Sequence, residues 1–426
     1  MTAMVELGAK GLADLVNDLQ RQYKLISGNR LSLDLSRGKP AADQLALSDD
    51  IESTINDNFL AEDGSDARNY GGLRGLSEAR ELGAEILGVP ASQVLAGGNS
   101  SLSLMHLVLS TALHKGLWQD ERNWSAGGDP SIITPVPGYD RHYTLSEALG
   151  IAMVTIPMGD EGPDFESVWS LVEDKPNIKG IWCVPKYSNP TGCIYSNAVV
   201  EGLAQTPNKA AADDFVVLWD NAYAVHDLTF PPQKLASIYD ASLKCGTEDH
   251  IVQFTSTSKI TFAGAGVAFL ASGSRVLDAL EAELAFQTIG PDKVNQLRHA
   301  RYLRGRIETH MRAHAELLKP KFNIVLEALE ANLGELGIAE WTRPNGGYFV
   351  SVDVTPGLAT KVIELARDVG LSLTPAGATF PYGNDPLDRN VRIAPTFADL
   401  EELSESMQVL TLCIKLATAQ SLIGNI

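Results

Sequence analysis

The chain has 426 residues, 44% of them hydrophobic and 20% charged, which is typical of a globular protein and too long for one ordinary core. Its 34 Lys and Arg against 53 Asp and Glu leave a net charge of −19, which argues against nucleic acid as a partner because such binding rests on cations that neutralise phosphates. No run approaches roughly 18 uncharged apolar residues, Met1–Lys10 lacks the pattern of a signal peptide and the four cysteines lack zinc-site spacing, so we expect a cytoplasmic protein with no membrane span and no metal.

The pattern of apolar residues changes from helical to strand-like along the chain. Gly11–Ile26 has apolar residues at close to helical spacing. Further on we predict strands buried on both faces, from the runs Ile132–Ile133, Ile151–Ile156, Ile181–Val184, Phe215–Trp219, Ile251–Phe254 and Val267–Leu270. Most of these runs are separated by enough residues for a crossover helix, as in a parallel sheet. The connection from Phe254 to Val267 is too short for one, which predicts an antiparallel last strand and therefore a mixed sheet.

The end of the chain predicts a second, smaller domain. Pro291–Leu329 is charged and helical in pattern, and it fits a helix that joins two domains. Two strand-like runs and a helical segment follow it, at Tyr348–Val352, Val391–Ile393 and Leu400–Ala417. We predict a large domain over residues 49–310 and a small α+β domain that combines the N-terminal segment 1–48 with residues 311–426.

Lys259 ends the hydroxyl-rich run Thr255–Ser258 and precedes small apolar residues. A lysine ammonium leaves water only at a high free-energy cost, so a lysine in these surroundings is either functional or an exposed loop residue between two strands. Burial would lower its pKa and leave a neutral amine, which is a nucleophile towards aldehydes. The serines beside it would suit a phosphate. This segment alone leaves both interpretations open.

Other polar residues follow predicted strands, where open sheets of this kind bind ligands. Asp220 follows the buried run Phe215–Trp219, and a carboxylate there needs a cationic or donating partner. It could hold a heteroaromatic ring nitrogen in its protonated form, or serve as a helix cap or in a structural ion pair. Tyr139 follows the first run, and Asn189 opens the turn Asn189–Gly192, so its amide would point towards the same edge.

Two more segments are ambiguous by themselves. Gly97–Ser101 precedes a helical stripe that starts at Leu102, so it is either an anion site at a helix N-terminus or an ordinary glycine turn with a serine cap. Arg392 lies in the strand-like run Val391–Ile393, and a buried guanidinium calls for a bidentate carboxylate, supplied by the protein or by a substrate.

In combination, these segments resemble the fold-type I, pyridoxal phosphate-dependent aminotransferases of the aspartate aminotransferase family. The resemblance extends from about Leu31 to Leu412, and the spacing of Asp220–Tyr223 to Ser256–Lys259 is its most specific part. The lead-in Pro185–Asn189 is similar to an atypical branch related to the aminotransferase-like domains of MocR-type regulators. The resemblance implies a mostly parallel, mixed, seven-stranded sheet in a large cofactor-binding domain, a smaller α+β domain, and a homodimer.

The resemblance also implies how pyridoxal 5′-phosphate would be held. Lys259 would form the internal aldimine with it and move protons at the substrate α-carbon. Asp220, supported by His142, would pair with the pyridinium nitrogen. Donors to the phenolate oxygen and a stacking ring would come from Tyr223, Asn189 and Tyr139. The phosphate would be bound by Asn99, Ser100, Ser101, Ser256, Ser258 and, from the neighbouring subunit, Tyr70.

For the substrate, the resemblance implies that Arg392 binds the α-carboxylate, helped by Asn189 and the backbone of Gly38. A dicarboxylic substrate needs a second cation, and the candidates that should border the cleft are Arg37, Lys39 and Arg141. One position departs from the family pattern: an arginine that binds the phosphate usually follows the lysine, and Gly264–Ala268 contains none. The phosphate would then be neutralised by additional hydroxyl and amide donors or by a relocated cation.

We therefore predict a transaminase that acts on an amino acid and a 2-oxo acid by a ping-pong mechanism, with L-aspartate and 2-oxoglutarate as the favoured pair. The alternatives on the same fold are another amino-acid aminotransferase and a carbon–sulfur β-lyase. A non-catalytic transcription regulator would need a DNA-binding module, and the roughly 30 residues before the aligned region are too few for a winged helix. A cofactor-free binding protein on this scaffold is a further alternative.

Overall fold

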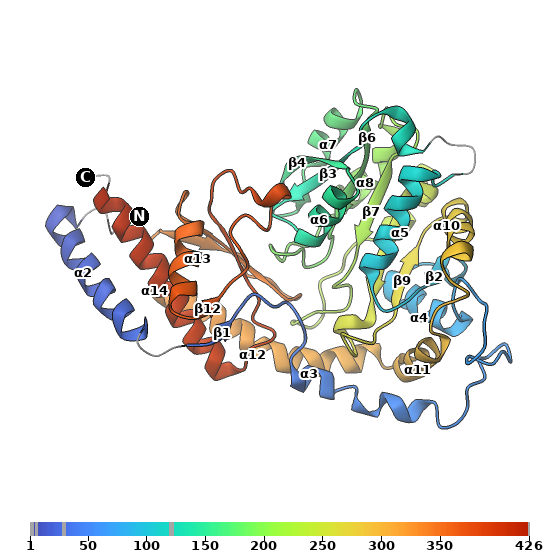
Figure 1. The fold of residues 1–426 in the computed structure, drawn as a ribbon, viewed down its shortest axis with the longest axis horizontal. Coiled ribbons are helices and arrows are strands. Elements are labelled where there is room, and N and C mark those ends of the chain that lie inside the picture. The colour runs from blue at the N-terminus through green and yellow to red at the C-terminus, as the bar shows by residue number, and fades with distance from the viewer. Residues whose placement is uncertain (1–3, 5–6, 28–30, 119–122, 425–426) are drawn as a thin grey trace.

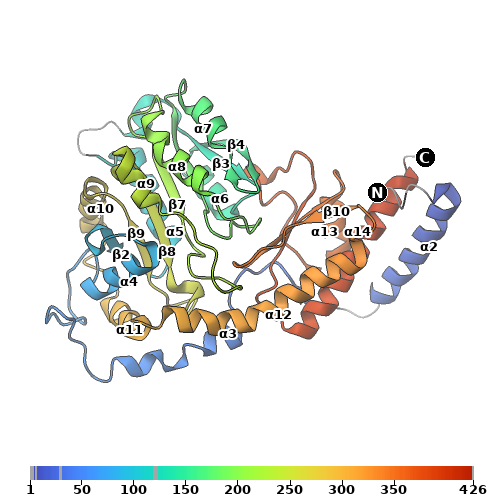
Figure 2. The ribbon, with the colours of Figure 1, turned by 180° about the vertical axis from the view of Figure 1, so that it is seen from behind.

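The computed structural model describes residues 4, 7–27, 31–118 and 123–424, so part of the Met1–Lys10 segment lies outside the described residues. Two parts of the molecule are joined by one long helix, α12 (Ile307–Leu333), which runs from an eight-stranded sheet to a three-stranded sheet (Figure 1). Figure 2 shows the same helix from behind, along the lower edge of both parts. The predicted two-part α/β architecture is therefore present.

The larger sheet is mixed and mostly parallel, as predicted. Its order is β2 (Val94–Ala96), β9 (Ala268–Ala271), β8 (Ile251–Ser256), β7 (Val216–Asp220), β6 (Ile178–Cys183), β3 (Ser131–Val136), β4 (Ala152–Gly159) and β5 (Gly162–Pro163). Strands β3, β4, β6, β7 and β8 are parallel, whereas β9 is antiparallel to β8 and confirms the expectation from its short connection.

Two predictions about this sheet were wrong. It has eight strands among the described residues instead of seven, because the chain returns through the two-residue strand β5, which pairs antiparallel with β4 and is too short to show a period. Strand β4 was expected to be buried on both faces, yet only Ile156 of its residues is buried. The reason is its place near the sheet edge, where β5 covers only its last two residues.

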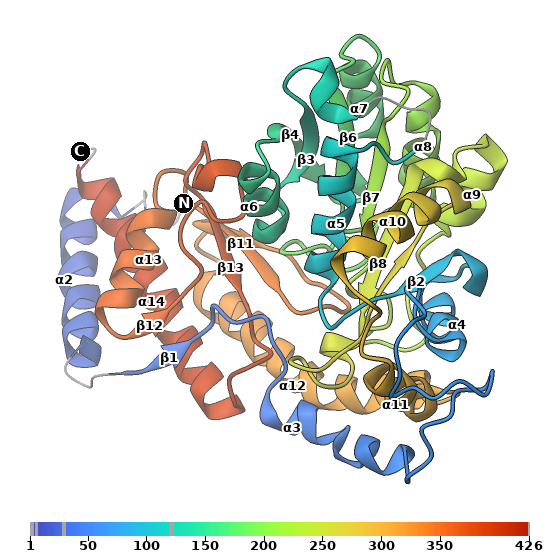
Figure 3. The ribbon, with the colours of Figure 1, turned by 45° about the vertical axis from the view of Figure 1, so that its right-hand side comes forward.

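Helices cover both faces of this sheet. One face packs against α5 (Ser101–His114) and α10 (Ser274–Gln287), which lie in front of it in Figure 3. The other face packs against α7 (Phe165–Val172), α8 (Asn197–Gln205) and α9 (Ile238–Cys245). Helices α4 (Ser77–Leu87), α6 (Asp140–Ala148) and α11 (Lys293–Leu303) also belong to this part, and α3 (Ala42–Ala46) packs against α12.

The smaller part is built on the antiparallel sheet β10 (Ala339–Trp341), β11 (Val350–Val354) and β13 (Asn390–Ile393). A short parallel pair, β1 (Leu33–Asp34) with β12 (Leu371–Ser372), ties the N-terminal segment to it. Helices α2 (Gly8–Ser27), α13 (Ala359–Asp368) and α14 (Leu400–Gly424) cover this part, and α2 lies beside α14 (Figure 1). The predicted N-terminal and C-terminal helices are thus confirmed, while the residue boundaries of the two domains stay a prediction.

The charged segment Pro291–Leu329 forms two helices, α11 and α12, where the pattern suggested one. Between them Gly305 has φ of +67°, a left-handed conformation that ends an α-helix. The break turns the chain from the large sheet onto α12.

Helix α14 is long and apolar enough to cross a membrane by length and composition alone. However, 61% of its most apolar stretch is buried inside the protein. Its neighbours there are α2, α12 and α13. Such burial is what the core helix of a folded domain shows, so this helix does not indicate a membrane span.

Candidate functional site

The carboxyl ends of three neighbouring parallel strands carry the central residues of the site. Strand β7 ends at Asp220, β8 continues into the turn Thr257–Lys259, and Asn189 follows β6. Asp220 is in register with Phe254, two residues before the end of β8. Lys259 Nζ lies 5.2 Å from the centroid of the Tyr223 ring. The edge predicted from the sequence is therefore where these residues meet.

Lys259 is only partly accessible to solvent. Burial lowers the pKa of its amine, while the nearby Asp220 carboxylate acts in the opposite direction. Burial is the larger of these two effects, so the neutral, nucleophilic form of the amine is favoured relative to a lysine in water. The interpretation of Lys259 as an exposed loop lysine does not fit these surroundings.

Asp220 is buried and held from one side only. Its Oδ2 lies 3.0 Å from His142 Nε2, and the His142 ring stacks on Trp182 with centroids 4.1 Å apart. Its Oδ1 is buried and has no hydrogen-bond partner among the described residues. A buried carboxylate oxygen without a donor is costly, so the missing donor should come from a bound molecule. A protonated heteroaromatic ring nitrogen, as in pyridoxal phosphate, fits this requirement.

The residues proposed for a phosphate come together around the start of α5. Ser258 Oγ donates to the Asn99 carbonyl at 3.2 Å, and Asn99 Nδ2 donates to the Gly264 carbonyl at 3.1 Å. Ser256 Oγ accepts from the Ser258 backbone N–H at 3.3 Å. Ser100 precedes Ser101 at the helix start, and its side chain makes no capping hydrogen bond. Free N–H groups at a helix start beside hydroxyls suit an anion.

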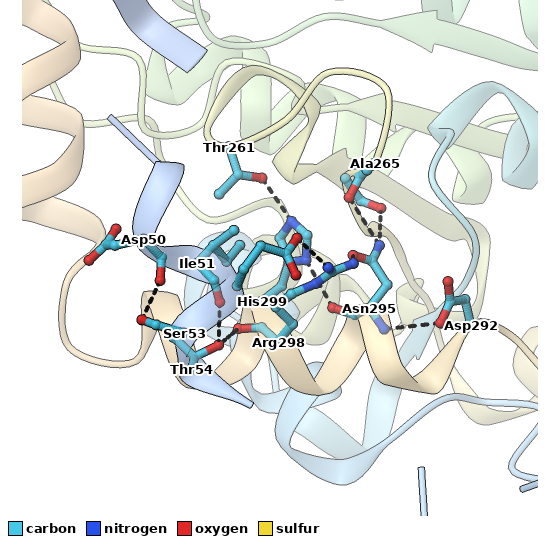
Figure 4. A network of polar contacts seen from close by, with 12 residues as sticks. Asp50, Ile51, Ser53, Thr54, Thr261, Ala265, Asp292, Asn295, Arg298 and His299 are labelled. Atoms are coloured by element: carbon cyan, nitrogen blue, oxygen red, sulfur yellow. Dashed lines mark hydrogen bonds and ion pairs between the residues drawn. The ribbon is translucent and has the colours of Figure 1, made fainter. Parts of the chain in front are cut away.

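The turn that lacks the usual arginine is held by a neutral amide. Asn295 Nδ2 donates to the carbonyls of Ala265 and Gly266, at 3.0 and 2.9 Å (Figure 4). Gly266 also lies so close to Ser258 that a Cβ there would be 2.9 Å from the Ser258 backbone nitrogen. The turn is thus packed tightly against the serine segment without a cation of its own.

Arg392 is buried on β13 and is engaged by protein groups. Its Nη1 donates to Asp140 Oδ1 at 2.9 Å and to Asn189 Oδ1 at 3.2 Å, and its Nε donates to Thr374 Oγ1 at 3.3 Å. No hydrogen bond among the described residues uses Nη2. Of the two alternatives left open by the sequence, a protein carboxylate partner is therefore present, and one nitrogen remains available to a ligand.

The other predicted residues are placed less centrally. Arg37 is exposed and pairs with Asp34 at 2.6 Å, and Lys39 lies over the Phe397 ring at 4.2 Å. Gly38 packs so close to Phe349 that it admits no Cβ. Arg141 is exposed and has no ion pair among the described residues, and its charge acts on Tyr139.

Tyr70 is 79% exposed. Its backbone carbonyl accepts from Lys293 Nζ at 3.0 Å. Within the described residues, no hydrogen bond or ring contact joins its side chain to the other predicted site residues. The structure therefore leaves Tyr70 out of the site of its own subunit.

Sequence reasoning missed Asp140 and Trp182. Asp140 directly follows Tyr139, and this adjacency was the available signal. The sequence contained no signal for Trp182, because buried strands contain many large apolar residues.

A cavity of about 770 Å³ borders the Asn189–Gly192 turn. Its lining includes Thr191, Gly192, Trp341, Ser351 and Arg389, but it contains neither Lys259 nor Asp220 nor Arg392. The site is thus defined by its chemistry and lies outside this cavity.

Acid is expected to destabilise the fold through buried histidines near Lys259. Burial lowers the pKa of His299 and of His314 to about 4, below the ordinary 6.5. The unfolded chain then binds protons that the folded protein excludes, so their stabilisation is complete above about pH 6.5 and is lost as the pH falls towards 4. We expect the free energy of unfolding to drop by about 2 kcal/mol per ring between pH 7 and pH 5.

Denaturant unfolding at fixed protein concentration, in steps from pH 7 to pH 5, measures this effect. The variants His299→Gln and His314→Gln should each show a flatter profile. A free energy of unfolding that is equal at pH 7 and pH 5 in the unmodified protein would contradict the expectation.

The chain matches the family model described as aspartate amino-transferase over residues 7–426. It is 43% identical over 406 residues to an aspartate aminotransferase of Corynebacterium glutamicum, covering 95% of this chain and 93% of the relative. A crystal structure of an aspartate transaminase from the same species has a TM-score of 0.93 at 42% identity, covering 97% and 98% of the two chains. An α-aminoadipate aminotransferase of Thermus thermophilus, complexed with N-(5′-phosphopyridoxyl)-L-leucine, shares the fold with a TM-score of 0.75 at 21% identity, covering 93% and 94%.

Proposed function

Because the chain belongs to the aspartate aminotransferase family of fold-type I, pyridoxal phosphate-dependent enzymes, we propose that it transfers the amino group of L-aspartate to 2-oxoglutarate by a ping-pong mechanism. The transaminase activity and its cofactor follow from the family, and the choice of amino acid and oxo acid is our proposal. The observation that carries it is the 43% identity, over almost the whole chain, to a relative named aspartate aminotransferase.

The site residues have complementary proposed roles. The cofactor, when bound, supplies an aldehyde and an electron-withdrawing ring that stabilises negative charge at the substrate α-carbon. Lys259 would hold it through its amine and move a proton at that carbon. Asp220, oriented by His142, would accept the ring N–H and keep the nitrogen protonated. Tyr223 and Asn189 would donate to the phenolate oxygen.

The remaining cofactor contacts also belong to the proposal. Tyr139 would stack on the ring, a role supported by its edge-on contact with His142 at 4.9 Å. The start of α5 and nearby hydroxyls would bind the phosphate, through Asn99, Ser100, Ser101, Ser256 and Ser258. The active unit would be a cytoplasmic homodimer in which the partner subunit's Tyr70 completes the phosphate site; the exposure of the Tyr70 side chain supports this.

For the substrate, we propose that Arg392 binds the α-carboxylate through Nη2, which makes no hydrogen bond among the described residues, with Asn189 and the Gly38 backbone beside it. Asp140 would orient the guanidinium, since it holds Nη1 at 2.9 Å. A carboxylate ligand and Asp140 would then share one cation, so the α-carboxylate should bind more weakly than it would at a free arginine.

A panel of amino donors tests the proposed substrate pair. Mixing each amino acid with the loaded enzyme in a single turnover should give the fastest spectral change with L-aspartate and L-glutamate. A clear preference for alanine or aromatic donors would overturn the substrate pair and leave the transaminase class intact. Release of pyruvate and ammonia from a β-substituted amino acid, with no oxo acid present, would instead indicate the β-lyase alternative.

Arg141 is the candidate that we expect to bind the side-chain carboxylate of aspartate. It lies in the first turn of α6, two residues after Tyr139, and its charge is not paired among the described residues. Replacing it by glutamine should lower kcat/KM for aspartate by about 10- to 100-fold, because a charge-assisted hydrogen bond is lost, and leave kcat/KM for alanine within about threefold. Arg37→Gln is the matched control, since Arg37 already pairs with Asp34. Equal losses for aspartate and alanine would contradict this role.

A further inference from the structure

Two histidines of α12 point at one backbone oxygen beside Lys259. His310 Nε2 lies 2.7 Å and His314 Nε2 lies 2.8 Å from the Ile260 carbonyl oxygen. The two nitrogens are 3.3 Å apart, as expected for two donors that share one acceptor. Gln44 Nε2 faces His314 Nδ1 at 3.4 Å, which places the His314 proton on Nε2, where it points at the carbonyl.

Two further histidines hold the residues on either side of Ile260. His226 Nε2 lies 3.2 Å from the Lys259 carbonyl oxygen. His299 Nε2 lies 2.8 Å from Thr261 Oγ1, and its Nδ1 lies 2.9 Å from the Asn295 carbonyl (Figure 4). Since a carbonyl only accepts, His299 Nδ1 donates and its Nε2 accepts from the Thr261 hydroxyl. Four of the eight histidines of the chain therefore contact three consecutive residues.

These rings are suited to act as neutral hydrogen-bonding groups. Burial lowers the pKa of each of them, and His310 and His314 lie too close for both to carry a proton charge. The charged groups that act on the rings from the surrounding elements are Asp43, Asp50, Glu52, Lys186, Lys259, Asp292 and Arg298. The network therefore keeps its donors at neutral pH.

The same network reaches the smaller part of the molecule. Tyr348 OH donates to the Lys259 carbonyl at 3.4 Å and accepts from Gln44 Nε2 at 3.1 Å. The next residue, Phe349, lies under the guanidinium of Arg392 at 4.8 Å. The turn that carries Lys259 is thus fastened to α12 and to the sheet that carries Arg392, and not only to its own strand.

We propose that His310 and His314 are positioning residues for Lys259, which clamp the Ile260 carbonyl and so hold the amine in the desolvated place from which it reacts. The other two rings bond the Lys259 carbonyl and the Thr261 hydroxyl, so the residues on both sides of the clamp are held as well. The inference rests on the proposed role of Lys259. It assigns a function to two histidines that have none in the proposed function.

The test measures the Lys259 amine in the cofactor-free protein. Reductive methylation by formaldehyde and a borane, followed by peptide mass spectrometry across pH, reports its pKa. His314→Leu removes one of the two donors to the Ile260 carbonyl, so the turn should loosen, the Lys259 amine should become better hydrated and its pKa should rise. The methylation rate at pH 8 should therefore fall at least about threefold. His314→Gln keeps an N–H near the Nε2 position and should stay within about twofold. In the loaded enzyme His314→Leu should lower kcat at least about tenfold with KM for the amino acid within about threefold.

His250→Leu is the matched control, because His250 Nδ1 also bonds a backbone carbonyl, that of Phe215 at 2.8 Å, at the opposite end of β8. It should lose stability and keep the methylation profile of the unmodified protein. His310→Leu, at a less buried ring, decides the matter if His314→Leu does not fold. The inference is overturned if every leucine variant of the two that folds methylates like the unmodified protein. Because this readout needs no cofactor, it is independent of whether Lys259 is the residue that binds it.

Discussion

Replacing Lys259 by alanine is expected to lower kcat for transamination on the order of 10⁵-fold, because one amine both holds the cofactor and moves the proton at the substrate α-carbon. Purified Lys259→Ala should lack the visible absorption band of the lysine-linked cofactor. It should also fail to show a single-turnover spectral change with L-aspartate on the time scale of the unmodified enzyme. Of all single replacements in the chain, we expect this one to have the largest effect.

Lys321→Ala is the matched control for Lys259→Ala. Lys321 is buried, donates to the Thr396 carbonyl at 3.0 Å and has a pKa lowered mainly by burial, yet it lies on α12 away from the strand ends that carry the site. Its loss should lower stability and leave the absorption band in place. If Lys259→Ala kept the lysine-linked band unchanged, the central assignment would fail.

The second large effect is expected from Asp220→Asn. The change keeps the size of the side chain and removes the charge that would hold the nitrogen of the cofactor ring protonated. The ring would then withdraw less electron density from the substrate α-carbon. We expect kcat to fall about 10³-fold, equivalent to about 4 kcal/mol of transition-state stabilisation. Steady-state kinetics with L-aspartate and 2-oxoglutarate measures the loss.

A control for Asp220→Asn must remove a buried carboxylate elsewhere. Asp214 pairs with Lys179 at 2.6 Å just before β7, at the opposite end of the strand from Asp220. Asp214→Asn should therefore lower the free energy of unfolding and keep kcat within about threefold. Comparable losses of kcat in the two variants would show that Asp220 acts only through stability.

Much of the larger sheet could be predicted because its central strands are buried on both faces. Burial on both sides selects continuous apolar runs such as Val216–Trp219, and the polar residue that ends such a run is easy to recognise. The same reasoning failed for β4 and β5 at the edge of the sheet. Only part of each strand is covered there, so the pattern of apolar residues does not show which side chains are buried.

The carbonyl clamp could not be predicted from the chain. Its two histidines, His310 and His314, share a helical spacing on α12, but nothing in the sequence connects them to the Ile260 carbonyl or to His226 and His299. His314 and Ile260 are separated by 54 positions, and a hydrogen bond over that separation exists only once the helix has packed against the sheet. Single histidines on helices are common, so each of them taken alone carries no signal.

The sequence by itself determined the chemical inventory of this protein: a lysine after hydroxyls, a carboxylate at the end of a buried strand, an asparagine turn and a late arginine. These follow from residues that are neighbours in the chain, where local structure depends on local pattern. Only the tertiary structure decided how they are paired. It brought Asp140 to Arg392 across 252 positions, left Asp220 Oδ1 without a donor among the described residues, and surrounded the Lys259 turn with imidazoles. Such pairings depend on how helices and sheets pack together, which no short stretch of sequence encodes.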